Sequence, residues 1–450
     1  MLVLKRVLKN SMANLINGMA TTLMGIGITP FLLDSLTNYE FTIWQLSLQI
    51  GLLFALLGMG SQTAVGRFVS LHLHDRVKKG NVITFSLYLV GAAFLFGLII
   101  LGVLHFNYDL VIDNFDTSSV DYSLSISLII LSYLINIFSF VFIGYFIGHE
   151  KNEIPMLVNV GSKLLTAFSV VVIAANHDFI WATITMLISA IITVLVLFIL
   201  FLRHFRGNLS FKLAFGNDFF SYTRFSLSLG VMGLASYIVS NSATLFLAKY
   251  DFSAVAPYTI AATLVTALVG VSGALINPMI QPLTRYYSEG EHQKITSLMI
   301  KLIWAILAYA SVLSGFILLL GDYFFEFYLG THTNNLVKTL FTMLSIVSLF
   351  RLVGMAFFVV LISQGRTKET LVYPILEAII YIISLLAFLK IYGVIGIVYS
   401  ICFSGIVILS VYSLYLINKV LVIKIHCLYL ASVTIGLPSA IIALIFMNIN

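Results

Sequence analysis

The sequence predicts an all-α protein that spans a membrane many times, and three observations lead to this fold class. Hydrophobic residues make up 60% of the 450 positions and charged residues only 9%, whereas a soluble domain carries roughly 25% charged residues. Apolar segments long enough to cross a bilayer recur along the chain, and the charge of the connections between them alternates. So few polar side chains cannot cover this much apolar surface in water, whereas lipid accepts it directly.

A window of about 19 residues marks thirteen apolar segments in the chain. The first of them is too long and too often interrupted by polar residues for a cleavable signal, so it counts as a spanning helix. We therefore expect helices near 11–33, 41–66, 82–105, 122–148, 154–175, 179–202, 219–248, 254–280, 295–321, 335–364, 369–389, 393–418 and 427–447.

The distribution of positive charge predicts the orientation. The net charge of +6 would suggest acidic partners or nucleic acid for a soluble protein, but in a membrane protein it sets the topology, and we expect no nucleic-acid partner. The connection at 107–122 holds four aspartates and no cation. By the positive-inside rule the N-terminus is cytoplasmic. Most of the 24 Lys and Arg residues lie in the connections of one set: Lys5, Arg6, Lys9, Arg67, Arg76, Lys78, Lys79, Lys151, Arg203, Arg206, Lys212, Arg224, Arg285, Lys294, Arg366, Lys368, Lys419 and Lys424.

Two short echoes indicate an internal repeat. "YEFT" at 39–42 returns as "YDFS" at 250–253, and the turns that contain Glu153 and Glu369 are separated by a similar offset. Six helices return a chain to its starting side, so two such halves form parallel repeats related by an axis along the membrane normal. The domains expected are a six-helix bundle at 1–202, a cytoplasmic connection at 203–218, a second six-helix bundle at 219–418 and an additional helix within 419–450.

Polar stripes on the repeat-equivalent helices mark a candidate cavity lining. Asn14 and Asn17 lie on one face of the first helix, Gln49 lies in the second, and Thr263 and Asn277 lie in the eighth. Small and polar residues also pack transmembrane helices together, and this alternative stays open.

Charges inside apolar segments are more informative, because each costs at least about 2.5 kcal/mol at a helix centre and faces the protein interior. Arg351 stands 14 residues before the turn at Gly365, about 21 Å along a helix and so near the membrane midplane. Lys163 lies about ten residues inside its segment, and Glu377 lies about eight residues inside its own. Two interpretations remain: Arg351 and Glu377 form a structural ion pair, or Arg351 and Lys163 give a cavity positive potential for an anion.

Motifs of enzymes and ATPases are absent: the chain has no Walker-type glycine loop, no HExxH and no nucleophile elbow. His72 and His74 are two residues apart and so lie on different helix faces, which disfavours a metal site. We expect no cofactor, no metal and no catalytic residues.

The N-terminal part resembles a known family. The stretch "KNSMANLINGMATTLMGIGITPFLLDSLTNYEFTIWQLSLQIGLLFALLGMGSQTAVGR" has an asparagine-bearing first helix, a proline near its outer end and an aromatic-rich start of the second helix. A glycine-rich stretch then follows and ends at Arg67. This pattern is similar to that of the bacterial polysaccharide or O-antigen (Wzx-type) flippases of the multidrug, oligosaccharidyl-lipid and polysaccharide exporter superfamily. A thirteenth helix departs from the usual twelve.

The resemblance implies a transporter, not an enzyme, in the bacterial inner (plasma) membrane. It implies two bundles around a central cavity that opens alternately to each side. The substrate would be an undecaprenyl-diphosphate-linked oligosaccharide moved from the cytoplasmic to the periplasmic leaflet, with other polysaccharide assembly proteins as further partners. Within this hypothesis four cations hold the diphosphate, namely Arg67, Arg285, Arg351 and Lys163, and five polar residues contact sugar hydroxyls, namely Asn14, Asn17, Gln49, Thr263 and Asn277.

Two alternatives stay open. A cation-coupled drug exporter of the same superfamily would use a carboxylate in the membrane, for which Glu377 is the candidate. A membrane glycan polymerase would carry a long external loop, but the longest external connection expected here, at 106–121, is short.

Overall fold

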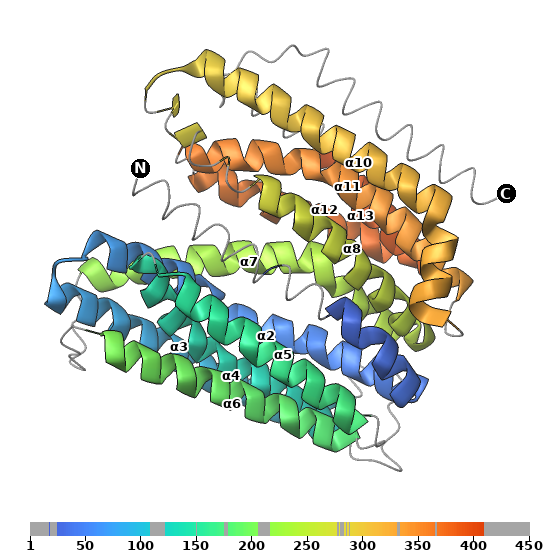
Figure 1. Cartoon of the computed structure of the whole chain (residues 1–450), viewed down its shortest axis with the longest axis horizontal. Helices are drawn as coiled ribbons and strands as arrows, with labels where there is room; N and C mark the ends of the chain where they lie inside the picture. Colours follow the sequence, from blue (N-terminus) through green and yellow to red (C-terminus); the bar gives the residue numbers. More distant parts are fainter. Residues whose placement is uncertain are drawn as a thin grey trace. The chain divides into compact units, whose positions relative to one another are not determined.

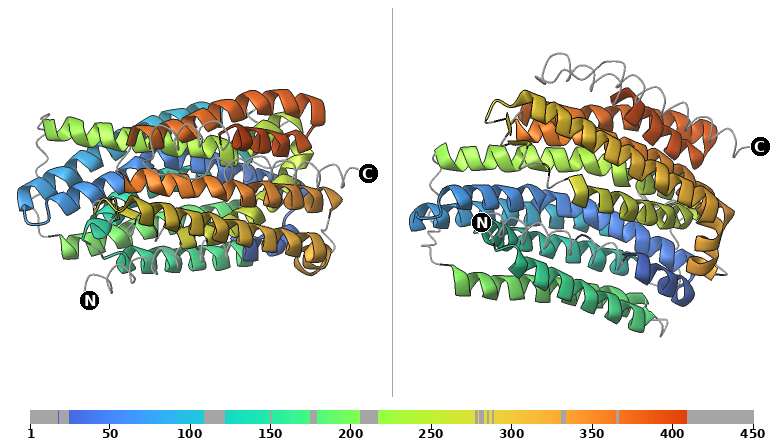
Figure 2. Two further views of the ribbon diagram at one scale, coloured as in Figure 1. Left: turned by 90° about the horizontal axis from the view of Figure 1, so that it is seen from above. Right: turned by 45° about the horizontal axis from the view of Figure 1, so that its top comes forward.

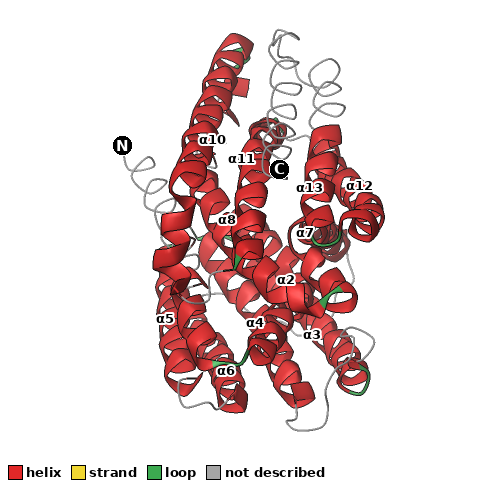
Figure 3. Ribbon diagram, turned by 90° about the vertical axis from the view of Figure 1, so that its right-hand side faces the viewer, coloured by secondary structure: helices red, strands yellow, loops and turns green. Residues whose placement is uncertain are grey.

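The computed structural model is helical apart from short turns in the part that it describes, which comprises residues 18, 25–108, 122–149, 151–174, 179–205, 217–276, 279, 283–284, 286–287, 289–330, 334–364 and 367–408. No strand occurs within these ranges, as Figure 3 shows. The predicted all-α fold is therefore confirmed.

The helices coincide with the predicted apolar segments. Their bounds are α2 Asn38–Leu71, α3 Arg76–His105, α4 Tyr122–Gly148, α5 Glu153–Ala174, α6 Phe179–His204, α7 Asn217–Tyr250, α8 Val255–Ile276, α10 His292–Leu329, α11 Asn335–Ser363, α12 Thr367–Tyr392 and α13 Ile395–Val407. A short 3-10 turn, Phe252–Ala254, connects α7 to α8. Of the first predicted segment, residues 18 and 25–33 are described and helical. The predicted helix at 427–447 lies outside the described residues.

Nine helices of the described chain are long and apolar enough to cross a membrane. The outer faces of these helices carry exposed apolar side chains, which explains why the chain needs so few polar residues to cover its surface. On α5, for example, Leu164, Leu165 and Phe168 are more than half exposed, as suits side chains that meet lipid tails. The protein is thus a multi-pass membrane protein.

The N-terminal compact unit comprises residues 1–237 and 244–256. Within it α4 packs most extensively against α2 and α6, and it also contacts α3 (Figure 1). Glycines let α2 and α4 approach closely, since a Cβ at Gly144 would lie 2.5 Å from the carbonyl oxygen of Gln62. Such small residues are typical of helix contacts in membranes, where van der Waals packing drives association.

The C-terminal compact unit comprises residues 238–243 and 257–450. In it α10 packs along α11, and α12 packs along α13 (Figure 2). The α12–α13 connection needs glycine twice: Gly393 has φ of 59°, and a Cβ at Gly396 would lie 2.2 Å from the carbonyl oxygen of Phe388. This tight turn places α13 antiparallel to α12 and beside α11.

These units are defined by contacts, so α7 contributes to both of them: Ile238–Ala243 belong to the C-terminal unit and the rest of the helix to the N-terminal unit. The division predicted from the repeat, at 203–218 between the sixth and seventh helices, concerns sequence symmetry and stays a prediction.

Candidate functional site

Arg67 lies one turn before the end of α2, and its side chain is exposed. The helix that carries it begins at a capping box, in which Thr37 and Glu40 each accept a hydrogen bond from the other's backbone amide. Such a start satisfies two amides that the helix itself leaves unpaired. At the other end of α2, the guanidinium of Arg67 lies over the ring of Phe225 from α7, 4.5 Å from the ring centroid.

The ring beneath Arg67 is held by other aromatic side chains. Phe68 meets Phe225 edge-on with 6.1 Å between centroids, and it meets Tyr222 in the same manner at 5.4 Å. Tyr222 is fully buried. Edge-to-face pairs at these separations are favourable beyond their buried area. We call Arg67, Phe68, Tyr222 and Phe225 the Arg67 cluster.

A close crossing of α2 and α7 fixes the Arg67 cluster. A Cβ at Gly60 would lie only 2.0 Å from the carbonyl oxygen of Ser226, so the two backbones touch there. The helices meet again near Gln49, whose backbone carbonyl accepts a hydrogen bond of 2.8 Å from the hydroxyl of Tyr237.

The turn after Arg67 is built as a helix cap. Asp75 accepts hydrogen bonds of 3.0 Å from the backbone amides of Val77 and Lys78. These hydrogen bonds, that from Lys78 foremost, hold the pKa of the Asp75 carboxyl below its ordinary value. Arg76 and Lys78 are exposed, whereas Lys79 is buried. The three cations after Arg67 therefore differ in their exposure to solvent.

Gln49 lies in the middle of α2. Its side-chain oxygen is buried, and no hydrogen-bond partner for it occurs among the described residues. A buried acceptor without a partner is costly, and a hydroxyl donor of a ligand or a water molecule would relieve that cost.

Lys163 is half-buried on α5. The neighbouring residue Ser162 belongs to a set of hydroxyls that joins α5 to α6. Ser162 is 3.3 Å from Ser189 and also hydrogen-bonds Thr193, while Thr166 hydrogen-bonds Ser189. This hydroxyl ladder is not among the sites predicted from the sequence, although both pairs of residues are spaced by four, which places each pair on one helix face.

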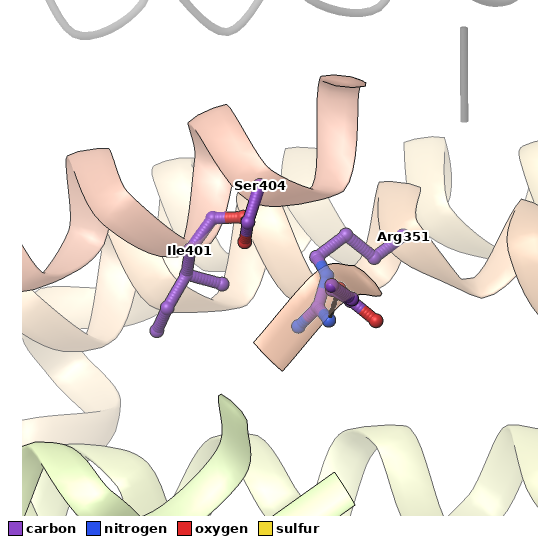
Figure 4. Close-up of polar contacts among 4 residues, drawn as sticks. Arg351, Ile401 and Ser404 are labelled. Carbon is purple, nitrogen blue, oxygen red and sulfur yellow. Dashed lines mark hydrogen bonds and ion pairs between the residues drawn. The ribbon is translucent and has the colours of Figure 1, made fainter. Parts of the chain in front are cut away.

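In the C-terminal unit, Arg351 of α11 and Glu377 of α12 form an ion pair. This is the pairing that the sequence left open. Glu377 is buried, and Arg351 retains 27% of its side-chain exposure. Helix α13 makes room for the arginine, because a Cβ at Gly405 would lie 3.0 Å from its Cγ and Cδ atoms. Figure 4 shows Arg351 with Ile401 and Ser404 of α13, whose own hydrogen bond runs from the Ser404 hydroxyl to the Ile401 carbonyl at 3.2 Å.

Two tyrosines flank this ion pair on α12. Tyr373 and Tyr381 lie four residues before and after Glu377, and both are close enough to act on the charge of Arg351. Tyr381 is fully buried. Their spacing of four residues from Glu377 places both tyrosines on the same helix face as the carboxylate, which could have identified them from the sequence. A tyrosine in an apolar helix, however, is indistinguishable in the sequence from one that only packs against its neighbours.

The structure thus describes Arg67, Gln49 and Lys163 in the N-terminal unit and Arg351, Glu377 and Thr263 in the C-terminal unit, Thr263 being half-buried on α8. It brings Arg351 and Glu377 together. Four predicted site residues lie outside the described residues: Asn14, Asn17, Asn277 and Arg285.

Several solved structures of membrane transporters share this fold. A multidrug resistance MATE family transporter of the MOP superfamily, in an inward-facing conformation, is 17% identical, with a TM-score of 0.63 over 88% of this chain and 92% of that one. The lipid II flippase MurJ in an inward closed conformation is 12% identical, with a TM-score of 0.67 over 98% of this chain and 99% of that one. A MOP superfamily transporter from Pyrococcus furiosus is 17% identical, with a TM-score of 0.58 over 90% and 94%.

At these identities the solved structures show the fold alone. A search of curated protein sequences found no match. The family model described as "Polysaccharide biosynthesis protein" matches residues 7–284, which is more than half of the chain. The chain has the fold of MOP superfamily transporters and belongs to the polysaccharide biosynthesis protein family.

Proposed function

We propose that this protein is a flippase that moves undecaprenyl-diphosphate-linked oligosaccharide units, of an O-antigen or a similar surface polysaccharide, across the bacterial inner membrane. The N-terminus is cytoplasmic, and transport runs from the cytoplasmic to the periplasmic leaflet by alternating access. The observation that carries this proposal is the match of residues 7–284 to the polysaccharide biosynthesis family on a chain with a transporter fold. One protein of that fold is described as a lipid II flippase.

The chemistry of the substrate explains why such a protein is needed. A diphosphate cannot enter the hydrocarbon core unaided, because a charge there is costly. The lipid tail can remain in the bilayer, so the protein has to accept only the diphosphate and the sugars. It needs cations for the first and hydrogen-bonding groups for the second.

Arg67 supports the first requirement. It is exposed at the end of α2, and its guanidinium forms no ion pair with any carboxylate in the described residues. Its fork of N–H donors matches the geometry of phosphate oxygens. We assign to Arg67 the first contact with the diphosphate, together with Arg285 of the equivalent helix in the second repeat.

Gln49 supports the second requirement, since its buried side-chain oxygen lacks a donor among the described residues. Sugar hydroxyls are donors of the right kind. Asn14, Asn17, Thr263 and Asn277 complete the proposed lining.

Arg351 has a different status. Glu377 neutralises it in the conformation described here, so a diphosphate reaches Arg351 only by replacing Glu377 as its partner. Lys163 is the remaining cation that we assign to the diphosphate path.

A drug exporter of the same superfamily is the competing function. Glu377 is the only buried carboxylate in the described part of the chain, and it is paired with Arg351. A paired carboxylate is less suited to bind a cationic drug or a coupling cation than a solitary one. This observation favours the flippase.

A reconstitution assay tests the proposal. The purified protein is placed in liposomes with a fluorescent polyprenyl-diphosphate disaccharide, and the fraction that changes leaflet is followed by quenching from outside. We expect rapid exchange with the wild type, at least a tenfold loss with Arg67→Ala, and little change with Arg76→Ala, which removes an exposed cation from the neighbouring turn. Exchange of the lipid no faster than in empty liposomes, combined with drug export by the same preparation, would overturn the flippase in favour of the exporter.

A further inference from the structure

We propose that Phe225 is a positioning residue for Arg67, which it holds so that the edge of the guanidinium faces an incoming diphosphate. This inference rests on the proposed function, because it concerns how that substrate is first recognised. It adds a residue on α7 that no pattern in the sequence distinguishes.

The geometry of the contact supports this role. The guanidinium carbon of Arg67 lies 4.5 Å from the centroid of the Phe225 ring and over its face. An aromatic face attracts a cation through the ring quadrupole. The N–H donors of arginine lie in the plane of the guanidinium, so a ring that contacts one side of the group leaves the donors on its other edges available for phosphate contacts.

The ring is itself fixed, which distinguishes this contact from chance stacking of two surface side chains. Phe225 is half-buried and meets Phe68 edge-on, and Phe68 in turn meets the fully buried Tyr222. The backbone beside the ring is held by the crossing of Gly60 and Ser226. The flexible side chain of Arg67 therefore contacts a ring, that of Phe225, whose position is fixed by the fold.

Arg67 also differs from Arg351, the arginine of the ion pair in the other unit. Arg351 has an intramolecular carboxylate partner in Glu377, whereas within the described residues Arg67 has an aromatic partner instead. An aromatic ring supports the guanidinium without neutralising it, so the full charge remains available to an anion from outside the protein.

A binding experiment with two probes tests the role of Phe225. The full-length protein in nanodiscs of zwitterionic lipid is titrated with farnesyl diphosphate and, separately, with inorganic pyrophosphate. The variants are Phe225→Leu, which removes the ring, Phe225→Tyr, which keeps it, and Arg67→Ala. Phe220→Leu is the matched control, because Phe220 is an exposed phenylalanine of the same helix. The thermal unfolding midpoint of every variant is measured alongside.

We expect Phe225→Leu to weaken binding of both probes about threefold to fivefold, the size expected for an exposed cation–π contact. Phe225→Tyr and Phe220→Leu should bind like the wild type. In the Arg67→Ala background, Phe225→Leu should have no further effect, because the ring acts only through the guanidinium.

Three results would overturn the inference. Phe225→Leu could bind both probes as tightly as the wild type, or it could weaken binding equally with and without Arg67, which would mark a purely structural role. It could also weaken farnesyl diphosphate alone, which would mean that the ring contacts the lipid tail. These results leave the flippase proposal standing, whereas a wild type that binds neither probe would end both.

Discussion

The guanidinium of Arg351 on α11 forms an ion pair with the buried carboxylate of Glu377 on α12. The two residues come from consecutive helices of one hairpin, and Gly405 of α13 lies against the arginine side chain. An ion pair inside a membrane helix bundle stabilises the fold only while both partners remain. Losing one partner leaves an uncompensated buried charge.

The first prediction separates stability from transport at this ion pair. Arg351→Met and Glu377→Met should each destabilise the protein by about 3–5 kcal/mol, and the double variant should regain most of that loss, because it leaves no unpaired charge. Thermal unfolding in detergent measures this directly.

If Arg351 also receives the diphosphate, the double variant should fold well and still fail to flip the lipid. A double variant that is stable and fully active would show that the ion pair is only structural. Equal unfolding midpoints for the wild type and both single variants would contradict the ion pair itself.

The second prediction concerns the crossing of α2 and α7. Gly60→Ala places a Cβ 2.0 Å from the carbonyl oxygen of Ser226, so one helix must shift, whereas the control Gly233→Ala meets its nearest neighbour, a Leu56 methyl, at 3.7 Å. We expect Gly60→Ala to cost about 1–3 kcal/mol of unfolding free energy, as overpacked sites do, and Gly233→Ala to cost little. Unfolding midpoints that fall by the same amount in both variants would contradict this close contact.

The third prediction concerns the hydroxyl ladder between α5 and α6. Ser189→Ala removes the partner of both Ser162 and Thr166. Interhelical hydrogen bonds in membranes contribute about 0.6 kcal/mol on average, so a loss of roughly 1 kcal/mol is expected. Thr185→Ala is the control, since the Thr185 hydroxyl donates only to the Trp181 carbonyl of its own helix. The ladder has no energetic role if the two variants unfold alike.

The fourth prediction concerns pH and His149, which follows the end of α4. Burial lowers the pKa of this histidine, and the charges of Lys79 and Lys151 lower it further, while a hydrogen bond with the Tyr145 carbonyl opposes the shift. A histidine whose folded-state pKa lies below its unfolded value binds protons more readily when unfolded. Its contribution to stability is therefore complete above about pH 6.5 and is lost as the pH falls below that value.

We expect the unfolding midpoint of the wild type to fall between pH 7.5 and pH 5.5, and His149→Gln to show a smaller fall over the same interval. The same pH dependence in both proteins would assign the effect to other groups.

The helices were predictable from the sequence because hydrophobicity and length alone decide which segments cross a membrane. All eleven labelled α-helices fall on predicted segments, and their bounds differ mostly by a few residues. A segment of this kind that crosses the bilayer has to be a helix, because every backbone polar group in the bilayer must form its hydrogen bond within the helix.

The candidate site was less accessible to prediction, because it depends on which faces of distant helices meet. The pairing of Arg351 with Glu377 is one of two interpretations that the sequence leaves open, because a charge in the membrane is rare and needs a counter-charge; the structure shows the pair. Phe225 was not named, since phenylalanine is abundant in this sequence, with 36 occurrences. Nothing local distinguishes the one phenylalanine that lies beneath Arg67. Tyr381 was missed for the same reason.

The most direct test of the central claim is genetic complementation that reports the side on which lipid-linked units accumulate. Deleting the gene in its host should abolish the long surface polysaccharide and leave lipid-linked units facing the cytoplasm. The wild-type gene should restore export, while Arg67→Ala at matched expression should not. Units that instead accumulate unpolymerised on the periplasmic face would contradict the account, because the protein would then act after translocation, as a polymerase does.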